Sequence, residues 1–319
     1  MIPTKKLIQP KSEYSKSSHA ILIKKDIKRN YMIYLMLLPV LIYFLAFHYG
    51  PMYGAQIAFR DYEHTKGIWG SDWVGLKHFM SFFSSYYFMR LLKNTLWLSI
   101  LDIAFGFPAP IILALMLNEM RNAKFKRLTQ TISYLPHFIS TVVICGMIID
   151  FTSTEGLINQ LIENLGGESI PFLSMAQYFR TIYISTNVWQ SVGWNSIIYL
   201  AAISNIDQQL YESATIDGAG RLRQILNITI PGILPIVTIM LILRLGSIMS
   251  MGNEKILLLY SPSTYSTADV ISTFVYRKGL LEGNYSYSTA VGLFNSVINF
   301  LMLISVNKIS RKISENSLW

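Results

Sequence analysis

Polar side chains recur on one face of an otherwise apolar stretch of the sequence, residues 181–206. At the 3.6-residue period of a helix, one face collects the polar side chains Asn187, Gln190, Ser191, Trp194 and Asn195. Amide and hydroxyl groups donate and accept hydrogen bonds, so such a face either holds helices together or lines a watery path. We predict that Asn187, Gln190, Trp194 and Asn195 line a substrate pathway, with helix packing as the alternative.

A second polar stripe and two ionisable residues lie within other apolar stretches. The last stretch carries small and polar side chains at spacings of three and four, namely Tyr285, Thr289, Gly292, Ser296 and Asn299. We include Asn299 in the predicted pathway. Asp102 and Arg244 each interrupt an apolar stretch, where a central charge costs roughly 2.5–3.5 kcal/mol. Both are therefore expected to face protein or water, and they are able to pair.

The sequence lacks the common motifs of nucleotide hydrolysis and of metal centres. It contains no G-x-x-x-x-G-K-[ST] phosphate loop and no H-E-x-x-H pair, and its five histidines are scattered. The single cysteine, Cys145, excludes an intrachain disulfide. We predict that the chain is not an enzyme and uses no metal or cofactor.

The composition indicates a membrane protein. Hydrophobic residues make up 52% of the 319 residues and charged residues only 14%, whereas soluble domains carry about 25% charged residues. Six apolar stretches are long enough to cross a bilayer as helices: 31–49, 91–118, 131–150, 181–206, 230–251 and 285–306. The sequence thus predicts an all-α, polytopic membrane protein with a six-helix domain over 31–306, a basic tail over 1–30 and a short tail over 307–319.

Basic residues predict the orientation. Segments 1–30, 118–130, 207–231 and 307–319 together hold 17 lysines and arginines, whereas segments 50–88, 152–180 and 253–284 hold 7. By the positive-inside rule, both termini face the cytoplasm. The formal charge of +9 does not indicate nucleic-acid binding, because eight of the basic residues crowd into the first 30 positions and no nucleic-acid motif is present. A lipid-headgroup contact of this tail is the alternative.

The predicted cytoplasmic loop 207–231 has the signals of a short helix–turn–helix. Asp207 is a possible N-cap, and the glycines at 218 and 220 end the first helix. A second helix from Gln224 then leads into the membrane. Such a projection either binds another protein or only closes a loop.

This loop resembles the signature of the permeases of binding-protein-dependent ABC importers, E-A-A-x3-G-x9-I-x-L-P. The residues on that register are Glu212, Ala214, Gly218, Ile228 and Pro231, with Ser213 and Ile230 as departures. The run Ala214 to Ala219 is similar to the carbohydrate-uptake branch. Further segments resemble its complex-oligosaccharide subgroup, which includes the maltose transporter permeases: 58–59, 73–76, 118–119, 134–138, 189–195 and 290–294.

The resemblance implies a type I ABC importer permease in a bacterial plasma membrane. Such a permease forms a heterodimer with a second homologous permease and receives an oligosaccharide from an extracytoplasmic solute-binding protein. Two separate ATP-binding cassette subunits hydrolyse ATP. The coupling helix that docks on them corresponds here to a set of five residues, Glu212, Ala214, Asp217, Gly218 and Gly220. An ion-coupled secondary transporter and an ABC permease for a non-sugar solute are the alternatives.

Overall fold

The computed structural model describes residues 25–249 and 252–314 and divides the chain into two units, 1–56 and 57–319. The first unit is a helix that runs through α2 (Tyr31–Phe44), the π-helical turn η1 (Leu45–Tyr49) and α3 (Gly50–Met52) into the 3₁₀ turn η2 (Tyr53–Phe59). Its apolar side chains are exposed along α2. An isolated apolar helix of this kind suits contact with lipid or with another helix.

The second unit contains the described elements from β1 onward. After a two-stranded antiparallel hairpin, β1 (Arg60–Asp61) and β2 (Asp72–Trp73), it is helical. Its longer helices are α5 (Lys77–Phe83), α6 (Tyr86–Leu101), α7 (Pro108–Glu119), α8 (Ala123–Tyr134), α9 (Thr141–Thr152), α10 (Leu157–Asn164), α11 (Ala176–Ser204), α12 (Gln208–Ile216), α14 (Ile230–Gly246), α15 (Asn253–Leu259) and α18 (Tyr285–Ser314). Shorter ones are α4 (Gly67–Gly70), α13 (Arg221–Gln224), α16 (Tyr265–Ala268) and α17 (Ile271–Tyr276).

Short 3₁₀ and π turns join these helices. The 3₁₀ turns are η4 (Leu135–Phe138), η5 (Phe172–Ser174) and η7 (Pro262–Thr264), and the π turns are η3 (Asp102–Gly106), η6 (Ile225–Thr229) and η8 (Arg277–Leu281). The π turns η1, η3 and η6 each end two residues before a proline, Pro51, Pro108 and Pro231 respectively. Because proline lacks the N–H that an α-helix needs and its ring crowds the preceding turn, the chain widens there.

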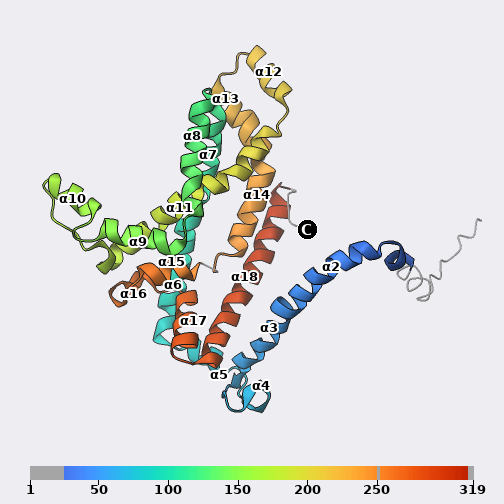
Figure 1. The fold of residues 1–319 in the computed structure, drawn as a ribbon, viewed down its shortest axis with the longest axis vertical. Helices are drawn as coiled ribbons and strands as arrows, with labels where there is room; N and C mark the ends of the chain where they lie inside the picture. The colour runs from blue at the N-terminus through green and yellow to red at the C-terminus, as the bar shows by residue number, and fades with distance from the viewer. Residues whose placement is uncertain (1–24, 250–251, 315–319) are drawn as a thin grey trace, which may run out of the picture. The chain divides into compact units, whose positions relative to one another are not determined.

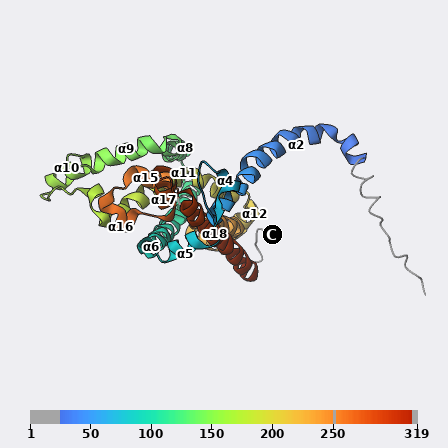
Figure 2. The ribbon, with the colours of Figure 1, turned by 90° about the horizontal axis from the view of Figure 1, so that it is seen from below.

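The second unit is built around α11. This helix packs against α7, α8 and α14, while α18 packs against α14 and α17. The α12 and α13 helices lie at one end of the unit and α5 at the opposite end, and α9 and α10 project to one side in both views (Figure 1 and Figure 2). Buried apolar side chains from α6, α11 and α15 form one core cluster, and α7, α11 and α14 form another.

A glycine allows close contact between α11 and α8. A Cβ atom on Gly193 would lie 2.0 Å from the carbonyl oxygen of Ser133, which no side chain tolerates. The backbones of α11 and α8 therefore touch at this position, as small residues permit in membrane helices.

Five described helices are long and apolar enough to cross a membrane: Tyr31–Phe59, Tyr86–Glu119, Thr141–Asn164, Arg221–Gly246 and Tyr285–Arg311. The all-α fold is confirmed, but the count of six spans stays a prediction. The helix expected at 181–206 is present as α11, which is 29 residues long. It is not among the five apolar helices, and the polar side chains on its face reduce its hydropathy.

The prediction of a single membrane helix as the third span is wrong. Residues 131–150 do not form one helix, because α8 ends at Tyr134 and α9 begins at Thr141. Pro136 lies in the 3₁₀ turn between them, and the side chain of Ser140 caps α9 by accepting from the Val143 N–H at 3.4 Å. Other boundaries also differ: α6 starts at Tyr86 rather than 91, α11 starts at Ala176 rather than 181, and α18 ends at Ser314 rather than 306.

Candidate functional site

A polar cavity of about 280 Å³ lies between α6, α11, α14 and α15. Its walls include the two ionisable residues expected inside the membrane and several side chains that the sequence did not single out. The lining residues are Ser99, Asp102, Ile103, Thr141, Tyr183, Asn187, Gln190, Arg244, Ser247, Ile248, Gly252, Glu254 and Lys255. The cavity therefore gathers hydrogen-bonding groups, some of them from α6 and α14, whose sequences are otherwise largely apolar.

A chain of four side chains crosses this cavity. Arg244 forms an ion pair with Asp102, which is buried and also accepts a hydrogen bond from the Asn187 amide. The Asn187 carbonyl oxygen in turn accepts from the Lys255 Nζ atom at 3.2 Å. Asp102 lies in the π turn η3, and such turns re-aim side chains at functional sites. The structure thus pairs Asp102 with Arg244, which the sequence left open.

Two further side chains fix the backbone at one wall of the cavity. The Ser99 hydroxyl donates to the Ile248 carbonyl, and the Asn299 amide oxygen accepts from the Met249 N–H at 2.9 Å. Asn299 was expected on the substrate pathway, but it does not line the cavity. Its contact with Met249 instead positions the chain where it leaves α14.

The predicted α11 stripe divides into two parts. Asn187 and Gln190 line the cavity, whereas Trp194 lies one turn further along and stacks on the His137 ring with centroids 4.6 Å apart. Phe138 meets the same indole edge-on at 5.5 Å. Asn195 is exposed and does not line the cavity. The stripe is therefore part cavity wall and part aromatic cluster at the break between α8 and α9.

Sequence reasoning missed the contribution of α15. Glu254 and Lys255 were assigned to an outer loop, and no local pattern shows that this loop forms a short helix against α9, α11 and α17. Ile256 and Leu259, both buried, anchor this helix in the core and so hold Lys255 at the cavity. The signal in the sequence was a charged pair, Glu254 and Lys255, directly before the apolar run 256–260.

The α12–α13 segment, residues 207–224, has the expected local structure. The Asp207 side chain caps α12 by accepting from the Gln209 N–H at 3.0 Å, and Gly218 follows with φ +73°, a conformation that favours glycine. The second helix begins earlier than expected, at Arg221 rather than 224.

Polar contacts hold α12 on the rest of this segment. The Gln224 amide donates to the Thr215 hydroxyl at 3.0 Å and to the Ala219 carbonyl at 3.1 Å. The Tyr211 hydroxyl lies 3.0 Å from that of Thr229. These contacts tie α12 to α13 and to the π turn η6 that leads into α14.

The exposed face of the α12–α13 segment is apolar. Leu210, Ile216 and Leu222 are exposed, Ile216 by 86%. A cavity of about 550 Å³ lies beside them and is lined in part by Glu119, Tyr211 and Glu212. Exposed apolar side chains next to a carboxylate-lined hollow suit contact with another protein.

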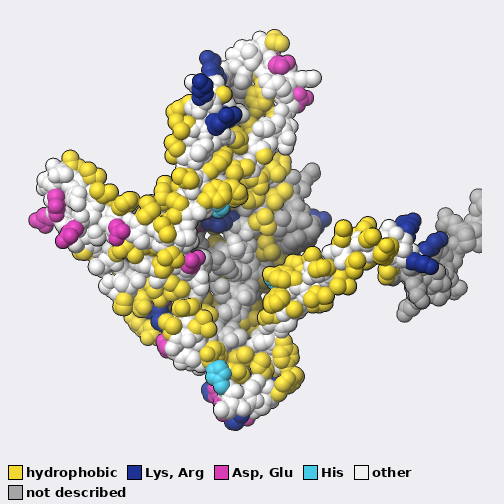
Figure 3. Space-filling view, in the orientation of Figure 1, with side chains coloured by type: hydrophobic (Ala, Val, Ile, Leu, Met, Phe, Trp, Pro, Cys, Tyr) yellow, Lys and Arg dark blue, Asp and Glu magenta, His cyan; other side chains and the backbone are white. Residues whose placement is uncertain are grey.

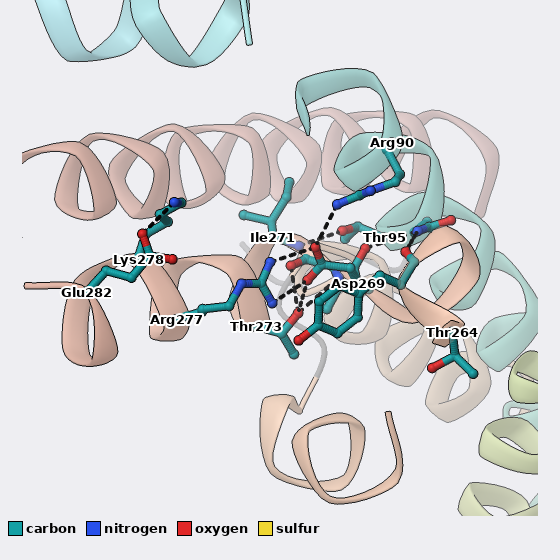
Figure 4. A network of polar contacts seen from close by, with 12 residues as sticks. Arg90, Thr95, Thr264, Asp269, Ile271, Thr273, Arg277, Lys278 and Glu282 are labelled. Carbon is teal, nitrogen blue, oxygen red and sulfur yellow. Dashed lines mark hydrogen bonds and ion pairs between the residues drawn. The ribbon is translucent and has the colours of Figure 1, made fainter. Parts of the chain in front are cut away.

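A buried ionic network lies elsewhere in the second unit. Asp269 is fully buried and accepts from Arg277 at 2.8 and 3.2 Å, from Arg90 at 3.2 Å and from the Thr273 hydroxyl at 3.0 Å (Figure 4). Burial acts to lower the pKa of Arg277, but the hydrogen bond and charge of Asp269 raise that pKa above its ordinary value. The Asn94 amide adds a bond to the Asp269 carbonyl at 3.1 Å, so this network ties α6 to the α16–α17 connection.

Comparisons with known proteins agree with this arrangement of a membrane helix bundle, a polar cavity and a projecting helix. Residues 106–315 match the family described as "Binding-protein-dependent transport system inner membrane component". The chain is 46% identical to Protein LplB of Bacillus subtilis (strain 168) over 92% of each chain. It is 45% identical to the polygalacturonan/rhamnogalacturonan transport system permease protein YteP of the same organism, over 96% of this chain and 95% of that one.

A solved structure is similar over nearly its whole length. It is a chain of a bacterial ABC transporter involved in the import of the acidic polysaccharide alginate, with 46% identity and a TM-score of 0.86 over 92% of this chain and 99% of that one. The same values hold for the alginate transporter in complex with a periplasmic protein bound to alginate pentasaccharide.

The apolar helices and these relatives together define a multi-pass membrane permease. The chain belongs to the family of binding-protein-dependent transport system inner membrane components, and it is a permease subunit of an ABC importer.

Proposed function

We propose that this chain is one half of a permease pair that passes an oligosaccharide through the bacterial plasma membrane by alternating access. A second homologous permease forms the other half, an extracytoplasmic binding protein delivers the sugar, and two separate ATPase subunits hydrolyse ATP. The relatives support this assignment, since one is named for polygalacturonan and rhamnogalacturonan transport and another imports alginate.

The polar cavity carries the proposal. Its volume of about 280 Å³ is slightly below the range of about 300–1,000 Å³ of most small-molecule sites, so it accommodates part of an oligosaccharide at a time. The partner permease would supply the rest of the path. Asn187 and Gln190 would contact the sugar, and the Trp194–His137 pair would offer an apolar ring surface one turn further along. Asn195 and Asn299, also predicted on the pathway, do not line this cavity.

We propose that the α12–α13 segment couples the permease to the ATPase. Its exposed Leu210, Ile216 and Leu222 would enter a cleft on the ATPase, and the carboxylate of Glu212 would meet a cation there. Gly218 keeps the turn in its left-handed conformation. Ala214, Asp217 and Gly220 complete this contact.

The charge distribution supports cytoplasmic termini. Basic side chains gather at the end of the second unit where α8 and α13 begin (Figure 3), and they include Lys124, Arg127, Arg221 and Arg223. Acidic side chains gather instead on and beside α10, where Glu155, Glu163 and Glu168 are exposed. By the positive-inside rule, the α12–α13 segment then faces the cytoplasm.

Reconstitution tests the proposal. Proteoliposomes that hold this chain, its partner permease and the ATPase should take up oligosaccharide only when ATP and the binding protein are both supplied. Glu212→Ala and Gly218→Val should abolish uptake while the permease pair still assembles. Uptake driven by an ion gradient without the ATPase would instead identify a secondary transporter.

The cargo is tested separately. Mass spectrometry of the ligand that co-purifies with the binding protein should identify an oligosaccharide. A peptide, amino acid or other non-sugar ligand would retain the ABC permease and overturn the carbohydrate assignment.

A further inference from the structure

Lys255 is a buried lysine whose ammonium group has no ion-pair partner in the described part of the chain. The residue is only 7% exposed, yet its single recorded hydrogen bond goes to a neutral amide, that of Asn187. Across residues 25–249 and 252–314, no carboxylate forms an ion pair with it. An ammonium group has three hydrogens to donate, so two are available toward the cavity that Lys255 lines.

Arg244, which also lines the cavity, has a counter-ion in this chain. Arg244 is matched by Asp102, and this carboxylate is also occupied by Asn187. The chain Lys255–Asn187–Asp102–Arg244 therefore holds two positive charges and one negative charge. A buried charge without a counter-ion is costly unless a ligand or water supplies the missing contacts.

The position of Lys255 is fixed rather than accidental. Ile256 and Leu259 of the same short helix are in the core, and α15 packs on α9, α11 and α17. Lys255 therefore has little freedom to turn its ammonium group out to solvent, although lysine side chains usually reach water when they can.

We propose that Lys255 binds a carboxylate of the cargo inside the membrane cavity, and that the chain accordingly passes anionic, uronate-bearing oligosaccharides. This inference rests on the proposed function and assigns the residue that reads the charge of the cargo. Asn187 holds the ammonium group in place from one side, and the carboxylate takes the remaining donors.

Glu254 lies next to Lys255 and also lines the cavity, but the two do not form an ion pair. Its carboxylate repels an anionic cargo and accepts hydrogen bonds from sugar hydroxyls. Glu254 thereby keeps the affinity of Lys255 for the cargo carboxylate low enough for the cargo to be released, as transport requires.

The test uses two cargoes that differ only in charge. A trisaccharide of galacturonate and the same trisaccharide with each carboxylate reduced to a hydroxymethyl group are offered to proteoliposomes containing the complete transporter. Lys255→Met should lower uptake of the charged trisaccharide about tenfold or more, the value expected for one lost hydrogen bond to a charged group, and uptake of the neutral one less than about twofold. Lys255→Arg should restore most of the charged uptake.

Two more variants sharpen the result. Glu254→Gln should shift preference toward the charged trisaccharide, because it removes a repelling charge. Lys278→Met is the matched control: this lysine is paired with Glu282, lies outside the cavity, and should leave both uptakes unchanged. The melting temperature of each variant in detergent shows that the bundle is intact.

The outcomes separate the two proposals. If the wild-type transporter moves neither trisaccharide with ATP and binding protein present, the proposed cargo class fails. If the wild-type moves the charged cargo but Lys255→Met reduces both uptakes equally, or neither, the assignment of Lys255 is overturned while the permease function stands.

Discussion

The Asp269 network and the α12–α13 segment differ in where their side chains find contacts, inside this chain in one case and at its surface in the other. Around Asp269, a fully buried carboxylate meets two arginines and a hydroxyl of the same chain (Figure 4). In the α12–α13 segment, large apolar side chains are exposed, and Ile216 is exposed by 86%. The Asp269 carboxylate thus finds its counter-ions within the same chain, whereas the apolar side chains of the α12–α13 segment would be buried only against a partner.

The Asp269 network therefore stabilises the folded chain, whereas the α12–α13 segment offers a surface for association. A buried carboxylate that pairs with two arginines holds its elements in one arrangement, because movement would leave charges without partners. An exposed apolar helix costs little in the isolated chain and gains its free energy on association. Substitutions in the two regions should accordingly affect different quantities, folding stability in one and assembly in the other.

The largest expected effect is at Asp269. Asp269→Asn should lower the free energy of unfolding by about 3–5 kcal/mol, because Arg90 and Arg277 lose the carboxylate that compensates them. Thermal unfolding of the detergent-solubilised chain measures this. Asp61→Asn, at a carboxylate that is 54% exposed, is the control and should have little effect. Equal melting temperatures for the two variants would show that the Asp269 network does not stabilise the fold.

At Ile216 the effect should fall on assembly instead. Ile216→Ser should weaken association with the ATPase by about 1.5–3 kcal/mol, the value of burying one such side chain, and leave the melting temperature unchanged. Affinity capture of the ATPase at several concentrations measures the loss. Leu165→Ser, at a side chain 88% exposed beyond α10, is the matched control. If both variants bind the ATPase as the wild type does, α12 is not the contact.

The link between α8 and α11 is tested at Gly193. Gly193→Ala should destabilise the chain by about 1–3 kcal/mol, since the new Cβ atom would lie 2.0 Å from the Ser133 carbonyl oxygen. Gly292→Ala, where no atom lies within 4 Å of the added Cβ, should be neutral or slightly stabilising. Comparable melting temperatures of these variants would show that the two helices do not touch in the folded protein.

A smaller effect is expected at Gly218. Gly218→Ala should cost about 1–2 kcal/mol, because φ there is +73° and a side chain strains that conformation. Gly220→Ala should cost less, since φ at Gly220 is −69°. Chemical unfolding of both variants decides whether backbone geometry, rather than space, accounts for glycine at 218.

The smallest effect concerns an exposed ion pair. The hydrogen bond from Lys77 lowers the pKa of Asp61 below its ordinary value of 3.8, so the pair stabilises the fold above pH 3.8 and loses that contribution as the pH falls through the lowered pKa. Both side chains are more than half exposed, and the contribution should be only about 0.2–1 kcal/mol. Lys77→Met should unfold slightly more easily than wild type at pH 6, and thermal unfolding should show this difference shrink as the pH is lowered below 3.8.

Local patterns in the sequence were sufficient for much of this protein. The cap at Asp207, the turn at Gly218 and the exposed apolar side chains of α12 follow from interactions within about ten residues. The apolar runs predict α6–α7, α14 and α18 because a helix in lipid must satisfy its own backbone. The break between α8 and α9 was also signalled by Pro136, although the prediction drew one span across it.

Only the tertiary structure decided the composition of the site. Helical spacing placed Asn187 and Gln190 on one face, but it could not show that Asp102 and Arg244 meet there across 142 positions of sequence. Nor could it show that Lys255 returns to the cavity from a presumed outer loop, 68 positions from the amide that it contacts. Periodicity reports which residues of one helix share a face, whereas contacts between distant elements depend on how whole helices pack, and no local pattern records that.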